Sequence, residues 1–218
     1  MAAVLNRVVN VAAYKFAKLT DLVETRDAPA RLDRRAKLRG AILLSTEGVN
    51  LSLAGDRDGI DATLADIRAI PGVGEFPVKE TYSDYQPFNR MLVKIKREII
   101  PFGVDGISPG DYTSARLSPE EMKRWLDEGR PVTLLDTRNR FEVAAGTFKG
   151  AVNIDIDNFR DFPAAVAKLP DAMKHGPVIT FCTGGVRCEK AAPYLERRLP
   201  RRLSTRRRHP RLLQVVRW

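Results

Sequence analysis

The chain has 218 residues, enough for one large domain or two small ones. Its 44% hydrophobic content supports an ordinary core, and no stretch approaches the roughly 20 apolar residues of a membrane span. The first residues lack the pattern of a signal peptide. Cys182 and Cys188 are the only cysteines, which excludes a disulfide framework. These features predict a soluble cytoplasmic protein.

The net charge of +10 is concentrated at one end of the chain. From Arg197 to Trp218 there are nine arginines and no acidic residue, and the rest of the sequence has 28 basic and 27 acidic residues. The body of the protein is therefore nearly neutral, so the overall charge is not evidence for an RNA-binding face.

The first hundred residues alternate strand and helix signals. We expect strands at residues 8–16, 40–46, 49–53, 76–82 and 91–96, and helices at residues 19–38 and 56–70. Thr20 or Asp21 can cap the first helix, and Pro71-Gly72 ends the second. The order βαββαβ predicts a ferredoxin-like α+β sandwich over residues 1–100.

A second α/β unit is expected over residues 118–196, after a linker rich in proline and glycine at 101–117. Ser118 and Pro119 mark a helix start. Apolar strands at 132–135, 151–154 and 177–181 alternate with helical segments at 118–129, 159–169 and 187–195. This alternation predicts a parallel sheet.

The loop Cys182-Thr183-Gly184-Gly185-Val186-Arg187 lies between a predicted buried strand and a predicted helix. Sites in such sheets lie beyond the carboxyl ends of the strands. The two glycines let the backbone curl into an anion-binding nest, and Arg187 adds a full positive charge, so the thiolate of Cys182 is favoured. A lone cysteine after a buried strand is often an apolar filler, but the whole combination favours a nucleophile.

This loop resembles the active-site loop of rhodaneses. The longer string Phe181-Cys182-Thr183-Gly184-Gly185-Val186-Arg187-Cys188-Glu189-Lys190-Ala191 is similar to that of the rhodanese-domain tRNA uridine(34) hydroxylases. Their N-terminal motifs are matched by Tyr14-Lys15-Phe16, by Ser45-Thr46-Glu47-Gly48-Val49-Asn50 and by Gly103-Val104-Asp105. The resemblance covers roughly residues 8–196. It implies a ferredoxin-like domain followed by a rhodanese domain.

The resemblance also implies a reaction, namely oxygen-dependent hydroxylation of the wobble uridine of tRNA at C5, which gives 5-hydroxyuridine. Cys182 would be the active-site thiolate or persulfide carrier, and the reactants would be molecular oxygen and an unidentified reductant. The alternatives are a sulfurtransferase that carries sulfane sulfur on Cys182 and a non-catalytic rhodanese-fold binding module. We expect tRNA as the partner and neither DNA nor a membrane; the sequence assigns no oligomeric state.

Three further residues are candidates for auxiliary roles. Cys188 could be a resolving thiol for an oxidised or persulfidated Cys182, or a packing residue. Asp136 and Arg138, which follow a strand, could bound the active-site crevice, but the favoured interpretation is a structural anchor for their loop, and Glu142 is similar. No metal site is expected, because the two histidines lack ligand spacing.

Two groups in the first unit could contact RNA. Lys94, Lys96 and Arg97 could bind phosphates, but the favoured interpretation is an exposed charged strand face. Bases could stack on the aromatic residues Tyr82, Tyr85 and Phe88, for which packing is the favoured interpretation.

Residues 197–218 form an aberrant arginine-rich tail without amphipathic period. Rhodanese domains continue at this point into a strand and a Gly-Gly turn. A codon choice exists for residues 198–209 that encodes such a strand and turn when it is read one base later, so we predict a reading-frame shift near Arg197 or Arg198. The domain would then be C-terminally incomplete, with an apolar sheet edge exposed, and unstable or inactive. The alternative is a genuine basic tail, and resequencing the gene decides between them.

Overall fold

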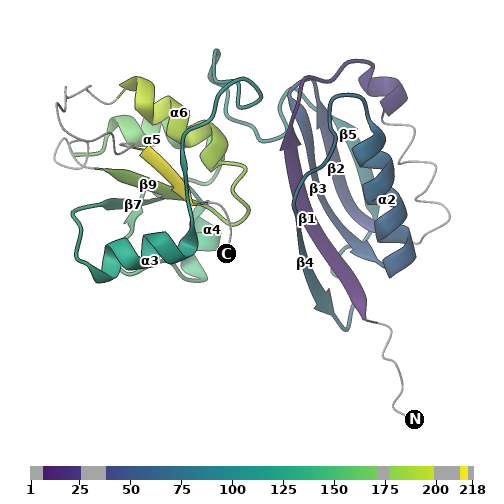
Figure 1. The fold of residues 1–218 in the computed structure, drawn as a ribbon, viewed down its shortest axis with the longest axis horizontal. Helices are drawn as coiled ribbons and strands as arrows, with labels where there is room; N and C mark the ends of the chain where they lie inside the picture. The colour runs from purple at the N-terminus through teal and green to yellow at the C-terminus, as the bar shows by residue number, and fades with distance from the viewer. Residues whose placement is uncertain (1–6, 26–37, 171–176, 199–211, 216–218) are drawn as a thin grey trace, which may run out of the picture. The chain divides into compact units, whose positions relative to one another are not determined.

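The computed structural model describes residues 7–25, 38–170 and 177–198, together with the backbone of residues 212–215. The chain divides into two compact units, residues 1–99 and residues 100–218 (Figure 1). Within the described ranges, none of the helices is long and apolar enough to cross a membrane.

The first unit is a five-stranded sheet with the order β4-β1-β3-β2-β5. Its elements are β1 (Val8–Phe16), β2 (Arg39–Ser45), β3 (Gly48–Gly55), α2 (Arg57–Ala69), β4 (Val78–Ser83) and β5 (Met91–Ile95). The pairs are antiparallel except for β2 with β5, which is parallel. The predicted ferredoxin-like sandwich is confirmed, with β5 as an additional edge strand. Of the helix predicted at 19–38, residues 22–25 are helical and residues 26–37 lie outside the described ranges.

Alternation of apolar residues builds the core of this unit. Val9, Val11 and Ala13 of β1 are buried on one face of the sheet. Helix α2 covers that face with its buried side chains, which include Ile60 and Ile67 (Figure 1). The helix begins where Asp56 predicts, because the side-chain oxygen of Asp56 accepts a hydrogen bond from the Gly59 amide at 2.7 Å.

The motif at residues 45–50 has a structural role. The carboxylate of Glu47 accepts a hydrogen bond from the Ile99 amide at 2.7 Å, and the Asn50 amide donates to the Ile99 carbonyl at 3.0 Å. The Ser45 hydroxyl donates to the Arg97 carbonyl at 2.8 Å. These side chains hold the backbone that leads out of the first unit.

The second unit is a five-stranded sheet with the order β6-β10-β9-β7-β8, and all of its strand pairs are parallel. The strands are β6 (Arg116–Leu117), β7 (Thr133–Asp136), β8 (Val152–Asn153), β9 (Val178–Phe181) and β10 (Leu212–Val215). The helices are α3 (Pro119–Asp127), α4 (Arg140–Ala144), a 3₁₀ turn at Phe159–Asp161, α5 (Phe162–Ala167) and α6 (Cys188–Arg198). The predicted parallel α/β architecture is confirmed.

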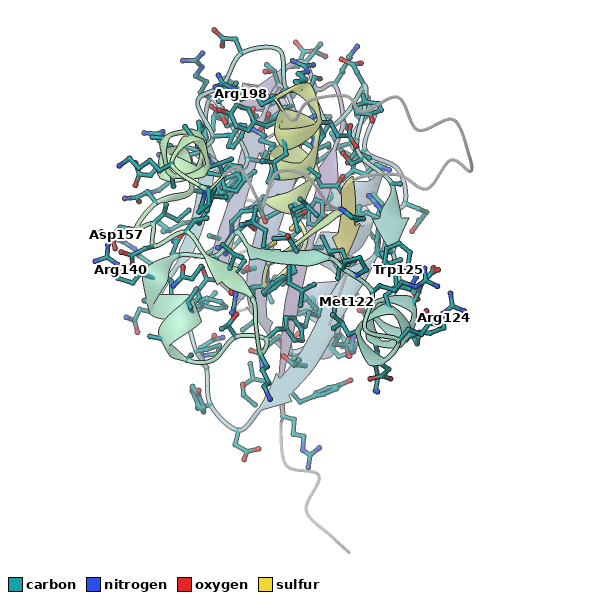
Figure 2. The ribbon with its side chains drawn as sticks, turned by 90° about the vertical axis from the view of Figure 1, so that its left-hand side faces the viewer. Met122, Arg124, Trp125, Arg140, Asp157 and Arg198 are labelled. Atoms are coloured by element: carbon teal, nitrogen blue, oxygen red, sulfur yellow. The ribbon has the colours of Figure 1, made fainter. Side chains whose placement is uncertain are left out.

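Helices cover both faces of this sheet. Helix α3 packs Met122 and Trp125 against Leu134 and Ile179 on one face, and α5 and α6 pack on the other face (Figure 1). Figure 2 shows Met122 and Trp125 turned inward from α3, whereas Arg124 is exposed. Coverage on both faces explains why the central strand β9 is buried at every residue.

The structure adds three features that the sequence did not predict. The segment expected as a linker contributes strand β6 and the buried side chains Phe102 and Ile107 to the second unit. Helix α4 was not expected. Strand β10 comes from the arginine-rich tail and lies between β9 and β6, where we expected the sheet to be open. Residues 199–211 and 216–218 lie outside the described ranges.

Candidate active site

Cys182 directly follows β9, so its sulfur lies at the carboxyl end of the central strand, as the sequence predicts. The residue is only 4% exposed, and its Sγ accepts a hydrogen bond from the Gly185 amide at 3.1 Å. Gly185 has φ 91°, a conformation that side-chain-bearing residues rarely adopt. The glycine therefore allows the loop to turn its amide toward the sulfur.

The surroundings of Cys182 favour its thiolate. A hydrogen bond from the Cys188 side chain, the charge of Arg187 and the backbone amides of Gly184 and Arg187 lower the pKa of Cys182 to about 6, although burial opposes them. The pKa of Cys188 is raised well above its usual value by burial and by the neighbouring Cys182. At neutral pH Cys182 is thus an anion next to a protonated thiol.

Cys188 is the first residue of α6 and is fully buried. Its Sγ lies 3.8 Å from the Thr137 hydroxyl, which also donates a hydrogen bond to the Phe181 carbonyl at 2.9 Å. Both cysteines are free thiols. The two cysteines therefore stand at the two ends of the segment 182–188, and each changes the pKa of the other.

Glu142 of α4 fixes the position of Arg187. Its carboxylate accepts two hydrogen bonds from the Arg187 guanidinium, at 2.6 and 2.8 Å, and a third from the Thr183 hydroxyl at 2.6 Å. Burial would raise the pKa of Glu142, but these hydrogen bonds outweigh it and lower that pKa to about 2. Both side chains of the pair are about 15% exposed or less. The sequence did not predict that Glu142 binds Thr183 and Arg187, because these partners lie 41 and 45 residues away along the chain.

Asp136 and Arg138 form a separate ion pair. The buried carboxylate of Asp136 accepts hydrogen bonds from Arg138 at 2.9 and 2.7 Å and from the Thr147 hydroxyl at 2.8 Å. Arg138 also donates to the Gly146 carbonyl at 2.7 Å. These contacts hold the segment from 136 to 147 together, which is the anchoring arrangement that the sequence favoured for this pair.

Arg187 also lines a cavity of about 430 Å³. The remaining lining residues come from the start of the second unit, the start of α4 and the 3₁₀ turn, and they are Ile100, Pro101, Asn139, Asn158, Phe159, Arg160 and Asp161. The cavity is mostly polar in its side chains and large enough for a nucleoside-sized molecule. Sequence reasoning did not find it, because no local pattern relates residues 100, 158 and 187.

Across the described residues, no group of three or more His, Cys, Asp and Glu side chains is placed to hold a metal ion. In the first unit, Lys94, Lys96 and Arg97 are exposed. Tyr82 and Tyr85 are 56% and 71% exposed, so they are not core residues, whereas Phe88 is partly buried.

Two family models match the chain. Residues 8–99 match the UPF0176 acylphosphatase like domain, and residues 118–209 match the rhodanese-like domain. A tRNA uridine(34) hydroxylase from Cupriavidus taiwanensis is 46% identical over 195 residues, which cover 87% of this chain and 69% of that protein. The protein of the same name from Bordetella petrii is 47% identical over 193 residues, covering 86% of this chain and 77% of that protein.

The chain belongs to the tRNA uridine(34) hydroxylase family. A third relative with this name, from Ralstonia nicotianae, is 44% identical over 195 residues. The family predicted from the cysteine string is therefore confirmed, and the order of an acylphosphatase-like domain followed by a rhodanese-like domain agrees with both halves of the fold.

Proposed function

We propose that this chain hydroxylates the wobble uridine of tRNA at C5 and forms 5-hydroxyuridine, with molecular oxygen as oxidant and an external reductant. The observation that carries this proposal is the 46% identity to a tRNA uridine(34) hydroxylase over 195 residues, which cover 87% of this chain. A tRNA substrate and two free thiols suit a reducing compartment, so we propose the cytoplasm as the site of the reaction.

Cys182 is the active-site residue of this proposal. Two observations support this role. The sulfur lies at the end of β9 and accepts a hydrogen bond from the Gly185 amide. Cys188 and Arg187 lower the pKa of the thiol, which favours the thiolate. A thiolate is the form that can attack C6 of uracil or carry a terminal sulfur. Thr183, Gly184 and Val186 complete the loop, whose backbone amides would face a bound anion.

The cavity beside Arg187 is the proposed place of the uracil base. Arg187 belongs both to the loop around Cys182 and to the cavity wall, so a base held there lies next to the reactive loop. The side-chain amides of Asn139 and Asn158 can each donate and accept, which complements the N3–H and carbonyl groups of uracil. Replacing Asn158 with alanine should raise KM for tRNA several-fold, with a loss of stability of only about 1 kcal/mol, because Asn158 also caps the 3₁₀ turn. An unchanged KM would remove the cavity from the proposal.

The second candidate is a sulfurtransferase, because the cradle around Cys182 would also hold the terminal sulfur of a persulfide. The two functions differ in their products. A sulfurtransferase forms thiocyanate from cyanide and a sulfane-sulfur donor, whereas a hydroxylase changes the nucleosides of tRNA.

The test is nucleoside mass spectrometry of tRNA from a strain that lacks the gene, complemented with this chain or with Cys182→Ser. We expect 5-hydroxyuridine to return with this chain and not with the variant. The control is urea unfolding of purified Cys182→Ser, which should match that of the unaltered chain, so that a loss of product reports on the thiol and not on the fold. Equal 5-hydroxyuridine with this chain and with Cys182→Ser would exclude Cys182 as the active-site residue.

A further inference from the structure

Cys188 is a buried reactive group that the proposed function does not use. Its side chain is fully buried at the start of α6, close enough to Cys182 to lower the pKa of that thiol, and its Sγ lies 3.8 Å from the Thr137 hydroxyl. A packing role alone needs no thiol at this position. The two free thiols are the only cysteines of the chain, and they lie together at the reactive loop.

The hydroxylation of uridine by O2 requires two electrons and two protons from a reductant, and a single thiolate has no S–H proton to supply. Insertion of one oxygen atom of O2 into the C5–H bond leaves a second oxygen atom, which becomes water only if two electrons and two protons are supplied. A thiol pair that closes to a disulfide releases two electrons and two protons. The two electrons and two protons that the thiol pair releases therefore equal the number that the second oxygen atom requires.

We infer that Cys182 and Cys188 form a two-electron store that is oxidised to a disulfide in each turnover of the proposed hydroxylation. In balance, uridine C5–H, O2 and the two thiols give uridine C5–OH, one water and the disulfide. The O–O bond, the C5–H bond and the Cys188 S–H bond break, and the C5–O, hydroxyl O–H, S–S and two water O–H bonds form. Solvent supplies the one proton that the Cys182 thiolate has already lost. The inference rests on the proposed function and names its reductant.

The two thiols are differentiated in the way that such a store requires. Cys182 is the thiolate and the more exposed sulfur, at 4% against 0% for Cys188. The second oxygen atom of O2 converts Cys182 to a sulfenic acid, and the thiol of Cys188 attacks that sulfur, which forms the disulfide and releases the oxygen as water. An external thiol then reopens the disulfide at Cys182, the sulfur nearer the surface. The reductant that completes the cycle is thus a small thiol or a protein dithiol.

The experiment is a single turnover without added reductant. The full chain is reduced, freed of reductant under nitrogen, mixed with unmodified tRNA and exposed to O2. We expect about one 5-hydroxyuridine per chain, together with one Cys182–Cys188 disulfide found by mass spectrometry of unreduced peptides. Because the chain has two cysteines, every lost thiol belongs to this pair. Without tRNA the disulfide should form much more slowly.

Cys188→Ser provides the second measurement. Without reductant its Cys182 should end as a sulfenic acid instead of a disulfide, because no second thiol is present to release the oxygen as water, and dithiothreitol should reduce it. Product from the unaltered chain with both thiols still free would overturn the inference and leave the proposed function standing. Disulfide formation that is equally fast without tRNA would also overturn it. No product even with excess dithiothreitol would overturn the proposed function itself.

Discussion

Replacing Glu142 with glutamine should destabilise the second unit by about 3 kcal/mol near neutral pH. The carboxylate accepts three side-chain hydrogen bonds from Arg187 and Thr183, and it is 15% exposed. Its pKa is lowered from 4.5 to about 2 by these bonds. Since each pKa unit corresponds to about 1.4 kcal/mol, the folded state favours the charged form by about 3 kcal/mol. A glutamine amide cannot accept both guanidinium bonds.

The stabilisation that the Glu142 carboxylate provides depends on pH. The pKa of Glu142 in the folded protein lies below its value in the unfolded chain. The stabilisation is therefore fully present above about pH 4.5 and is lost as the pH falls toward about 2. The difference in free energy of unfolding between the chain and Glu142→Gln should shrink correspondingly between these pH values.

The assay is urea unfolding followed by tryptophan fluorescence at several pH values. Trp218 is replaced by phenylalanine in every chain compared, so that Trp125, buried in the core of the second unit, is the only tryptophan and reports on that unit. This matters because a chain of two units need not unfold in one step. The matched control is Glu128→Gln, which removes an exposed ion pair with Arg130 and should cost less than about 1 kcal/mol. A loss for Glu142→Gln as small as that of the control, or one independent of pH, would refute the reasoning.

Three further changes test other contacts. Cys188→Ala should raise the pKa of Cys182 above about 6, seen as an upward shift in the pH midpoint of its alkylation rate; an unmoved midpoint would contradict the hydrogen bond between the thiols. Asp136→Ala should cost about 3 to 5 kcal/mol in urea unfolding, because it leaves the Arg138 guanidinium without its carboxylate. Phe102→Ala should cost about 3 to 5 kcal/mol in the second unit, since the ring is buried and stacks on Phe159 at 4.9 Å. An unchanged free energy of unfolding of the second unit in Phe102→Ala would show that residues 101–117 act only as a linker.

Long periodic elements could be predicted from the sequence. Strand β1 covers the residues that its apolar alternation predicted, and α2 begins and ends within one residue of the range predicted for it. The short strands β7 and β9 could be found because they are apolar runs. Strand β6 and helix α4 could not, because they are too short to show a period. The segment before α3 was expected to be a linker on account of its prolines and glycines. Its two apolar side chains Phe102 and Ile107 instead complete the core of the second unit.

The active-site loop could be predicted from the sequence, but the contacts that hold its side chains in place could not. Cys182, the glycines and Arg187 are contiguous in sequence, so the strand, the turn and the charge can be recognised together. The bond between Arg187 and Glu142 joins residues 45 positions apart and depends on how α4 packs beside the loop. Cys188 could be placed near Cys182 from the helix start, but the hydrogen bond between the thiols and the difference in their pKa required the structure.

The most direct test of the account follows the oxygen atom itself. Purified chain is incubated with unmodified tRNA, a thiol reductant and heavy-isotope oxygen gas, and the nucleosides are analysed by mass spectrometry. We expect 5-hydroxyuridine that carries one heavy oxygen atom from the oxygen gas, and no such product with Cys182→Ser. Unmodified uridine under these conditions, or a product whose new oxygen comes from water, would contradict it.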